Sequence, residues 1–282
     1  MPYRSIFVGP LFDTHIEERR PADALASYAL ELAALGNAHL SIGVGSCKFS
    51  VPAAGVVREA SGLIATANRE RHEHAETFGA ELLTRARAAG VVASVEVVHD
   101  EYSEVATRFV RMARVADVAI LQPSDEALSL MQGVVEDVLF ESGRPVIIVP
   151  ASWDKPASLE TIIVSWDGSA KAARAIGDAL PLLQQAGRVE IVSISGDTDS
   201  TKRIEGAEIA PHIARYCRSV SVTTLPAQGG DVGETLSNHA ANIHASMIVM
   251  GAYAHNRLRQ FVLGGVTSTM IADPPVPVLM SY

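Results

Sequence analysis

The sequence predicts an α/β protein in which two tandem domains each form a five-stranded parallel sheet with helices on both faces. Short apolar segments of strand length alternate with longer segments of helical period along the whole chain. The same order of elements occurs twice, and aliphatic residues dominate, with aromatic residues making up only 5%. These observations favour doubly wound sheets, and the duplication favours a pseudo-dimer.

The first half begins with the apolar run SIFV and ends with the run PVIIV. Its expected strands are 5–8, 39–44, 93–98, 118–121 and 145–149. Its expected helices are 21–35, 60–89, 104–115 and 134–141.

The second half repeats this order. RSIFVG corresponds to ETIIVS, ADVAIL to ASMIVM, and SGRPVIIVP to PPVPVLMSY. The expected strands are 161–165, 189–194, 220–224, 247–250 and 276–280. The expected helices are 170–185, 202–217, 232–244 and 266–272.

A short polar segment with two prolines, PASWDKPASL at 150–159, separates the halves. We therefore expect domains at 1–150 and 158–282. Because the linker is short, the halves should pack together. Their two final strands are the candidates for pairing edge to edge, which would hide exposed strand edges. Further pairing of the chain into a homodimer is left open.

The composition excludes several classes of protein. The chain has 282 residues and a net charge of −9 without a long basic run, which argues against nucleic acid as a partner. No apolar run reaches the ~18 residues of a membrane span, and no signal peptide is recognisable. Cys47 and Cys217 are far apart and are expected to be unpaired thiols. We expect a cytoplasmic protein with no membrane partner.

Ligands of open α/β sheets bind at the carboxyl ends of the strands, where the strand order reverses. In the second half, Ser165, Trp166 and Asp167 follow the first strand, and Ile194 ends the second strand. The Asp167 carboxylate could accept hydrogen bonds from ribose hydroxyls or an adenine amine. Alternatively, Asp167 or Ser169 simply caps the next helix. The backbone near Ile194 could pair with an adenine edge.

The fourth strand of the second half leads into a glycine-containing stretch, MGAYAHNRLRQFVLGGVTST at 250–269. A strand, a glycine-rich loop and a helix N-terminus together form a phosphate cradle. The candidate residues are Met250, Gly251, Ala254, His255, Gly264, Gly265, Val266 and Thr267. A surface loop followed by a Thr-capped helix is the alternative.

Other chemistry finds little support. GxxxxGK[ST] is absent, and no GxGxxG follows a strand, so a P-loop NTPase and a dinucleotide oxidoreductase are disfavoured. His72 and His74 are two positions apart on an expected helix, so we place them on a solvated face and not at a metal. No catalytic residue and no metal ligand is expected.

These residues resemble the universal stress protein family, whose nucleotide motif is Gly, two residues, Gly, nine residues, Gly, then Ser or Thr. The corresponding positions here are Gly251, Ala254, Gly264 and Gly265, and Asp167-Gly168-Ser169 matches the first-strand signature. The resemblance covers both halves and implies a tandem member. It further implies that Asp167 and the backbone near Ile194 hold adenosine, that Met250 and Gly251 contact the ribose, and that 264–267 holds the phosphates of ATP or AMP, with or without Mg²⁺.

The chain departs from the motif at two positions. Ala254 replaces a glycine, which costs on the order of 1 kcal/mol if the position needs a positive φ. Gly265 replaces a hydroxyl donor worth roughly 1.5–3 kcal/mol. We therefore expect weak binding, in the second half only.

In the first half, Pro123 stands where the motif would begin, so this half is expected to bind no nucleotide. The expected role is a regulatory protein of the stress response with unknown protein partners. A nucleotide-free scaffold and a slow ATP hydrolase or autokinase are the alternatives.

Overall fold

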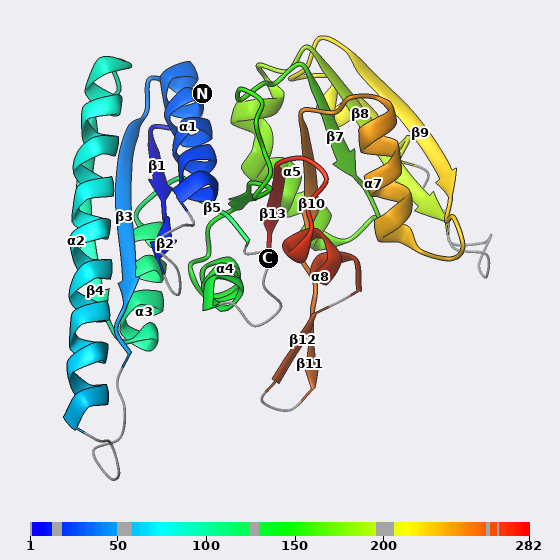
Figure 1. The fold of residues 1–282 in the computed structure, drawn as a ribbon. Coiled ribbons are helices and arrows are strands. Elements are labelled where there is room, and N and C mark those ends of the chain that lie inside the picture. Colours follow the sequence, from blue (N-terminus) through cyan, green and yellow to red (C-terminus); the bar gives the residue numbers. More distant parts are fainter. Residues whose placement is uncertain are drawn as a thin grey trace.

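The computed structural model describes residues 2–12, 19–49, 58–123, 130–195, 206–257, 260–263 and 265–282. Its centre is an 11-stranded sheet that runs through both halves of the chain, with helices on each face (Figure 1). The doubly wound α/β fold and the pseudo-dimer predicted from the sequence are confirmed.

The first half contributes six strands and four helices to the described residues. The strands are β1 (Ser5–Val8), β2 (Leu11–Phe12), β3 (His39–Cys47), β4 (Ala93–Asp100), β5 (Val118–Leu121) and β6 (Val146–Ile148). The helices are α1 (Arg19–Gly36), α2 (Arg58–Ala88), α3 (Tyr102–Arg114) and α4 (Leu130–Glu141).

The second half contributes five strands to the large sheet, a separate hairpin and four helices. The strands are β7 (Thr161–Ser165), β8 (Arg188–Ser195), β9 (Val220–Pro226), β10 (Met247–Gly251) and β13 (Val278–Ser281), and the hairpin is β11 (Ala254–Arg257) with β12 (Gln260–Leu263). The helices are α5 (Ala170–Leu183), α6 (Ala210–Ile213), α7 (Val232–Asn242) and α8 (Gly265–Ala272).

Both halves arrange their strands in the same order. The first half reads β4-β3-β1-β5-β6 and the second reads β9-β8-β7-β10-β13, with parallel pairing within each half. In each half the first strand therefore lies between the second and the fourth. The chain order reverses at that point, which opens a crevice between the first and fourth strands.

The halves are joined edge to edge through their final strands. β6 and β13 pair antiparallel, with Ile148 opposite Val278, Ile147 opposite Leu279 and Val146 opposite Met280. The predicted pairing of the two final strands is confirmed. It removes two of the four edges that separate sheets would expose.

Two apolar cores lie on opposite faces of the sheet, and each extends through both halves. One core packs α1, α2 and α5 on side chains such as Ile6, Val8, Ile162 and Val164. The other packs α3, α4, α7 and α8 on Phe7, Ile163 and other alternate strand residues. Because strand side chains alternate between faces, each apolar strand supplies both cores.

Polar contacts also cross between the halves. The Tyr3 hydroxyl donates to the Asp178 carbonyl at 2.7 Å, and the Ala157 amide donates to the Glu31 carboxylate at 2.6 Å. Since cores and contacts are shared, the division into domains at 1–150 and 158–282 stays a prediction from the repeat.

Two expectations differ from the structure. The helix expected over 202–217 is only the single turn α6, because Gly206 takes a left-handed φ of 69° and Pro211 lacks an amide donor. Of that expected helix, 202–205 lie outside the described residues. The stretch expected as a glycine-rich loop contains the hairpin β11–β12, with Ala254 opposite Leu263.

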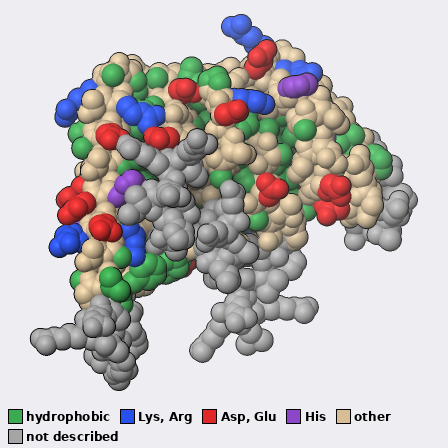
Figure 2. All heavy atoms as spheres, viewed as in Figure 1, with side chains coloured by type: hydrophobic (Ala, Val, Ile, Leu, Met, Phe, Trp, Pro, Cys, Tyr) green, Lys and Arg blue, Asp and Glu red, His purple; other side chains and the backbone are tan. Residues whose placement is uncertain are grey.

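The described helices include none that is long and apolar enough to cross a membrane. On the face shown in Figure 2, acidic and basic side chains are interspersed over the surface.

The β6–β13 junction predicts a stability effect. Leu279 is fully buried and lies opposite Ile147, so Leu279→Ala should lower the free energy of unfolding by about 2–5 kcal/mol. Urea denaturation measures this change. Val115→Ala is the matched control, because Val115 is 81% exposed and its loss should stay within about 0.5 kcal/mol. Equal effects of the two substitutions would contradict the claim that packing at the β6–β13 junction stabilises the fold.

Candidate functional site

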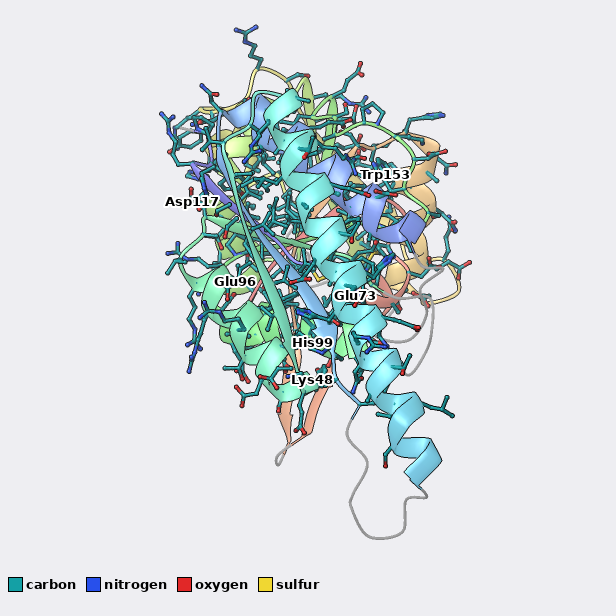
Figure 3. The ribbon with its side chains drawn as sticks, turned by 60° about the vertical axis from the view of Figure 1, so that its left-hand side comes forward. Lys48, Glu73, Glu96, His99, Asp117 and Trp153 are labelled. Atoms are coloured by element: carbon teal, nitrogen blue, oxygen red, sulfur yellow. The ribbon has the colours of Figure 1, made fainter. Side chains whose placement is uncertain are left out.

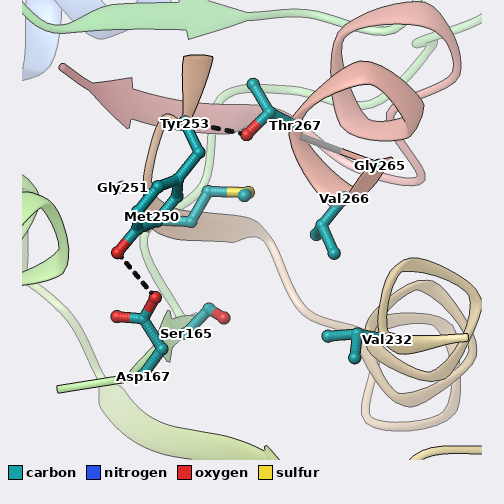
Figure 4. A pocket seen from close by; sticks show the side chains of 9 residues that line it. All are labelled: Ser165, Asp167, Val232, Met250, Gly251, Tyr253, Gly265, Val266 and Thr267. Carbon is teal, nitrogen blue, oxygen red and sulfur yellow. Dashed lines mark hydrogen bonds between the residues drawn. The ribbon is translucent and has the colours of Figure 1, made fainter. Parts of the chain in front are cut away.

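A pocket of about 250 Å³ opens at the carboxyl ends of β7 and β10, at the reversal of strand order in the second half (Figure 4). It is bounded by the ends of these two strands and by the first residues of α7 and α8. The lining residues are Ser165, Asp167, Val232, Met250, Gly251, Tyr253, Gly265, Val266 and Thr267.

Strand alternation decides which residues reach this pocket. Met250 lines it and belongs to the core beneath α7 and α8. Trp166 follows Ser165 and therefore turns to the opposite face, where it is 7% exposed within the core of α5. The structure thus brings the predicted Ser165 and Met250 together and places Trp166 away from them.

Asp167 is not the N-cap of the helix that follows it. The Ser169 hydroxyl accepts from the Ala172 amide at 3.0 Å and is the N-cap of α5. Asp167 is exposed; its Oδ1 accepts from the Ser169 amide at 3.0 Å, and its Oδ2 accepts from the Tyr253 hydroxyl at 2.9 Å. Ser169, and not Asp167, therefore caps α5.

Gly251 is required by packing. A Cβ atom at this position would lie 2.7 Å from the Ala172 amide nitrogen and 2.7 Å from the Lys171 carbonyl carbon. Backbone atoms cannot move aside as a flexible side chain can, so only glycine lets α5 approach the end of β10 this closely. Gly251 lines the pocket, but the packing of α5 against β10 requires a glycine here whether or not a ligand binds.

The first turn of α8 forms the opposite wall. Gly265 is exposed, and a Cβ atom there would meet no atom of the described residues within 4 Å. Thr267 is 1% exposed, and its hydroxyl accepts from the Tyr253 amide at 3.0 Å. The first amides of a helix lack intrahelical acceptors and favour an anion. Thr267 therefore fixes the chain after β10 against α8, with its side chain buried.

The first turn of α7, where Val232 lies, already has an acidic cap. Asp231 Oδ1 accepts from the Glu234 amide at 2.9 Å. The Asp231 carboxylate would repel an anion at this helix end. Of the two helices that begin at the pocket, α8 therefore has the N-terminus that suits a negative group.

The remaining predicted site residues are not among the lining residues. Ile194 lies on β8 opposite Leu225, one strand away from β7. Ala254 and His255 lie in β11, of which only the backbone is described. The positive-φ residues other than glycine are Asn37 and His244 in the described chain, so the cost expected for a left-handed Ala254 does not arise. Gly264 lies outside the described residues.

Tyr253 is the main site residue that sequence reasoning missed. Burial, followed by its interaction with Asp167, raises the pKa of its hydroxyl. Its ring also lies 5.6 Å from the Lys171 ammonium. A tyrosine two residues after a strand that ends at the predicted crevice was the available signal.

The histidines expected on a solvated face contact the protein instead. His72 stacks on His99 of β4, with ring centroids 4.5 Å apart, and His74 packs edge-on against Phe12. Figure 3 shows His99 beside α2, close to Lys48. Among the described residues, no group of three or more His, Cys, Asp or Glu could hold a metal ion.

In the first half, the described residues after β1 differ from those after β7. After β1, the residues continue as β2, which pairs with β3 at Gly45 and Ser46. A Cβ atom on Gly45 would lie 2.6 Å from the Leu11 side chain, and one on Gly9 would lie 2.7 Å from Phe109. Among the described residues, apolar side chains therefore pack closely on the backbone beside the end of β1.

Residues 159–281 match the family model described as the universal stress protein family, so the second half of the chain is a universal stress protein domain. The family recognised from the sequence is confirmed by this match.

The whole chain has the fold of a universal stress protein from Archaeoglobus fulgidus, with a TM-score of 0.68, 20% identity and 97% of both chains covered. A segment of 51 residues is 39% identical to a stress response protein, NhaX, of Bacillus subtilis. That segment is 18% of this chain and spans 31% of the relative.

The two pocket glycines should respond oppositely to substitution. Gly251→Ala places a methyl group against the backbone of α5 and should lower the melting temperature by several degrees. Gly265→Ala meets open space at the start of α8 and should leave the melting temperature unchanged or raise it. Calorimetric melting of both variants is the measurement, and equal destabilisation would show that the packing argument is wrong.

The stacked histidines predict a dependence of stability on pH. Burial first, and then the positive charges of His72, Lys48 and Arg71, lower the pKa of His99 below its ordinary value of 6.5. The folded protein therefore binds fewer protons here than the unfolded chain, so stability is full above about pH 6.5 and falls as the pH drops below it.

Urea midpoints between pH 8 and pH 5 should show a smaller acid loss in His99→Gln than in the unmodified chain. His212→Gln, at a helix without this stack, is the control. A slope that His99→Gln leaves unchanged would contradict the assignment.

Proposed function

We propose that the pocket between β7, β10 and α8 binds an adenine nucleotide, ATP or AMP, and that the protein acts as a nucleotide-responsive regulator of the stress response. The observation that carries this proposal is the pairing of an exposed carboxylate, Asp167, with the first turn of α8 across one pocket. An acceptor for hydroxyl groups and an anion-favouring helix end together suit a sugar phosphate.

The phosphate would lie against the first turn of α8. The open space beside Gly265 lets a ligand approach the backbone there, and the helix dipole favours its negative charge. The side-chain hydroxyl that the family motif carries is missing at Gly265, and the Thr267 hydroxyl is buried against the Tyr253 amide. Phosphate binding would depend on backbone amides, so we expect weak affinity.

The sugar would lie at Asp167, beside Met250 and Gly251. The base would extend toward the end of β8, where the predicted contact with Ile194 remains to be tested. This arrangement follows the crevice at the strand-order reversal, the usual ligand position in open α/β sheets.

The first half would bind no nucleotide and would serve as the structural partner. In its described residues, Phe109 and Leu11 pack closely on Gly9 and Gly45 after β1, and Pro123 stands where the motif would begin. The cytoplasmic location stays a prediction from the sequence, and a further homodimer and the protein partners stay open.

A nucleotide-free scaffold and a slow ATP hydrolase or autokinase are the competing functions. The pocket lining offers Asp167 and the Tyr253 hydroxyl as titratable groups, and these two are bonded to each other. We therefore favour a binding role over a catalytic one.

Binding is tested on the purified full chain. Acid extraction should release co-purified ATP or AMP, and calorimetry should detect AMP and ATP binding at millimolar concentration or below. Absence of binding for ATP, ADP and AMP at millimolar concentration would leave the scaffold.

Substitution of Asp167 tests the site. Asp167→Ala should weaken AMP binding about threefold, because the ribose loses a charged acceptor whose net contribution is reduced by the Tyr253 bond that the ribose must displace. Asp154→Ala is the matched control, since Asp154 is an exposed carboxylate of the segment between the halves. Unchanged affinity in Asp167→Ala would place the ligand elsewhere.

A further inference from the structure

We propose that Tyr253 sets the sugar specificity of this pocket, because its hydroxyl and the sugar hydroxyls of a nucleotide compete for Oδ2 of Asp167. This inference rests on the proposed function and concerns the same pocket. It assigns a role to a residue at one of the two unspecified positions of the motif, between Gly251 and Ala254.

Tyr253 spans the pocket between its two polar walls. Its amide donates to the Thr267 hydroxyl of α8 at 3.0 Å, and its own hydroxyl donates to Asp167 Oδ2 at 2.9 Å, as the dashed lines in Figure 4 show. The backbone end is anchored at a side chain that is 1% exposed, whereas Asp167 at the ring end is exposed. A rotation of the ring away from Asp167 would leave the amide bond to Thr267 in place.

The oxygen that Tyr253 contacts is the one available to a ligand. Oδ1 of Asp167 accepts from the Ser169 amide in the turn that leads into α5. This local contact orients the carboxylate and directs Oδ2 toward the pocket, where Tyr253 meets it. A ligand hydroxyl that bonds Oδ2 must share it with the tyrosine or displace it.

The sugar is the part of a nucleotide that reaches this oxygen. A phosphate on the first turn of α8 lies near Thr267. Tyr253 connects Thr267 to Asp167, because its amide bonds the Thr267 hydroxyl and its own hydroxyl bonds the Asp167 carboxylate. The sugar adjoins the phosphate through a single ester linkage, whereas the base lies further along the molecule. The ring hydroxyls of ribose are therefore the donors that meet Asp167.

Competition predicts weak discrimination between sugars. When ribose binds, one hydroxyl-to-carboxylate bond replaces another, so the ribose hydroxyls add little to affinity. Tyr253→Phe removes the internal donor and keeps the ring. Asp167 then gains a partner only when a sugar hydroxyl arrives, and the preference for ribose should increase.

The experiment compares AMP with 2′,3′-dideoxy-AMP by calorimetry on the full chain, Tyr253→Phe and the control Tyr216→Phe. Tyr216 is 41% exposed beyond α6 and packs on His212. We expect the ratio of the two dissociation constants to rise about threefold or more in Tyr253→Phe and to stay unchanged in Tyr216→Phe. An unchanged ratio in Tyr253→Phe, or weaker AMP binding, would overturn the proposal.

A spectroscopic readout follows the tyrosine directly. In protein labelled with ¹³C at the tyrosine ζ-carbon, the signal absent from Tyr253→Phe is that of Tyr253. It should move when AMP is added and move less with dideoxy-AMP. Equal movement with both ligands would contradict competition.

Failure of the proposed function gives a different result. If neither the unmodified chain nor Tyr253→Phe binds AMP at millimolar concentration, both the function and the role of Tyr253 are wrong. The other outcome is that the unmodified chain binds AMP, Asp167→Ala binds it more weakly, and Tyr253→Phe leaves the ratio of the dissociation constants for dideoxy-AMP and AMP unchanged. In that case the proposed function stands and only this inference is wrong.

Discussion

The antiparallel pairing of β6 with β13 is the contact on which the rest of the architecture depends. Three residue pairs join two parallel sheets into one and allow each core to continue through both halves. The strands involved are almost entirely buried, so the junction is stabilised by apolar packing on both faces as well as by ladder hydrogen bonds. With these edges joined, β4 and β9 are left at the two ends of the sheet.

The repeated strand order places two equivalent crevices in the sheet, and the residues beside each crevice make the two different. In the first half, Pro10 and Leu11 lead into β2, and Leu11 packs on Gly45 where a larger residue would clash. In the second half, Ser169 caps α5 at once, so Asp167 remains at the rim of an open pocket. A duplicated fold thus permits the two halves to differ at the same position of the sheet, with a pocket between β7 and β10.

Much of the fold could be predicted because strand and helix periods are local properties of the sequence. The strands Ser5–Val8, Val118–Leu121 and Thr161–Ser165 have the predicted bounds, since each is an apolar run flanked by polar or turn residues. The hairpin β11–β12 could not be predicted, because glycines and arginines suggested a loop. The bond between Tyr253 and Asp167 joins residues 86 positions apart, and only the assembled sheet brings them together.

The glycine motif does not by itself indicate a ligand, because packing alone explains Gly251. A glycine after β10 is already explained by the backbone of Lys171 and Ala172, which leaves no room for a side chain. The glycine would be needed whether or not a nucleotide binds. Gly265 differs, since nothing in the described chain fills the space beside it. The physical case for a ligand therefore rests on that helix end and on Asp167, whose second oxygen accepts from the Tyr253 hydroxyl at the edge of the pocket.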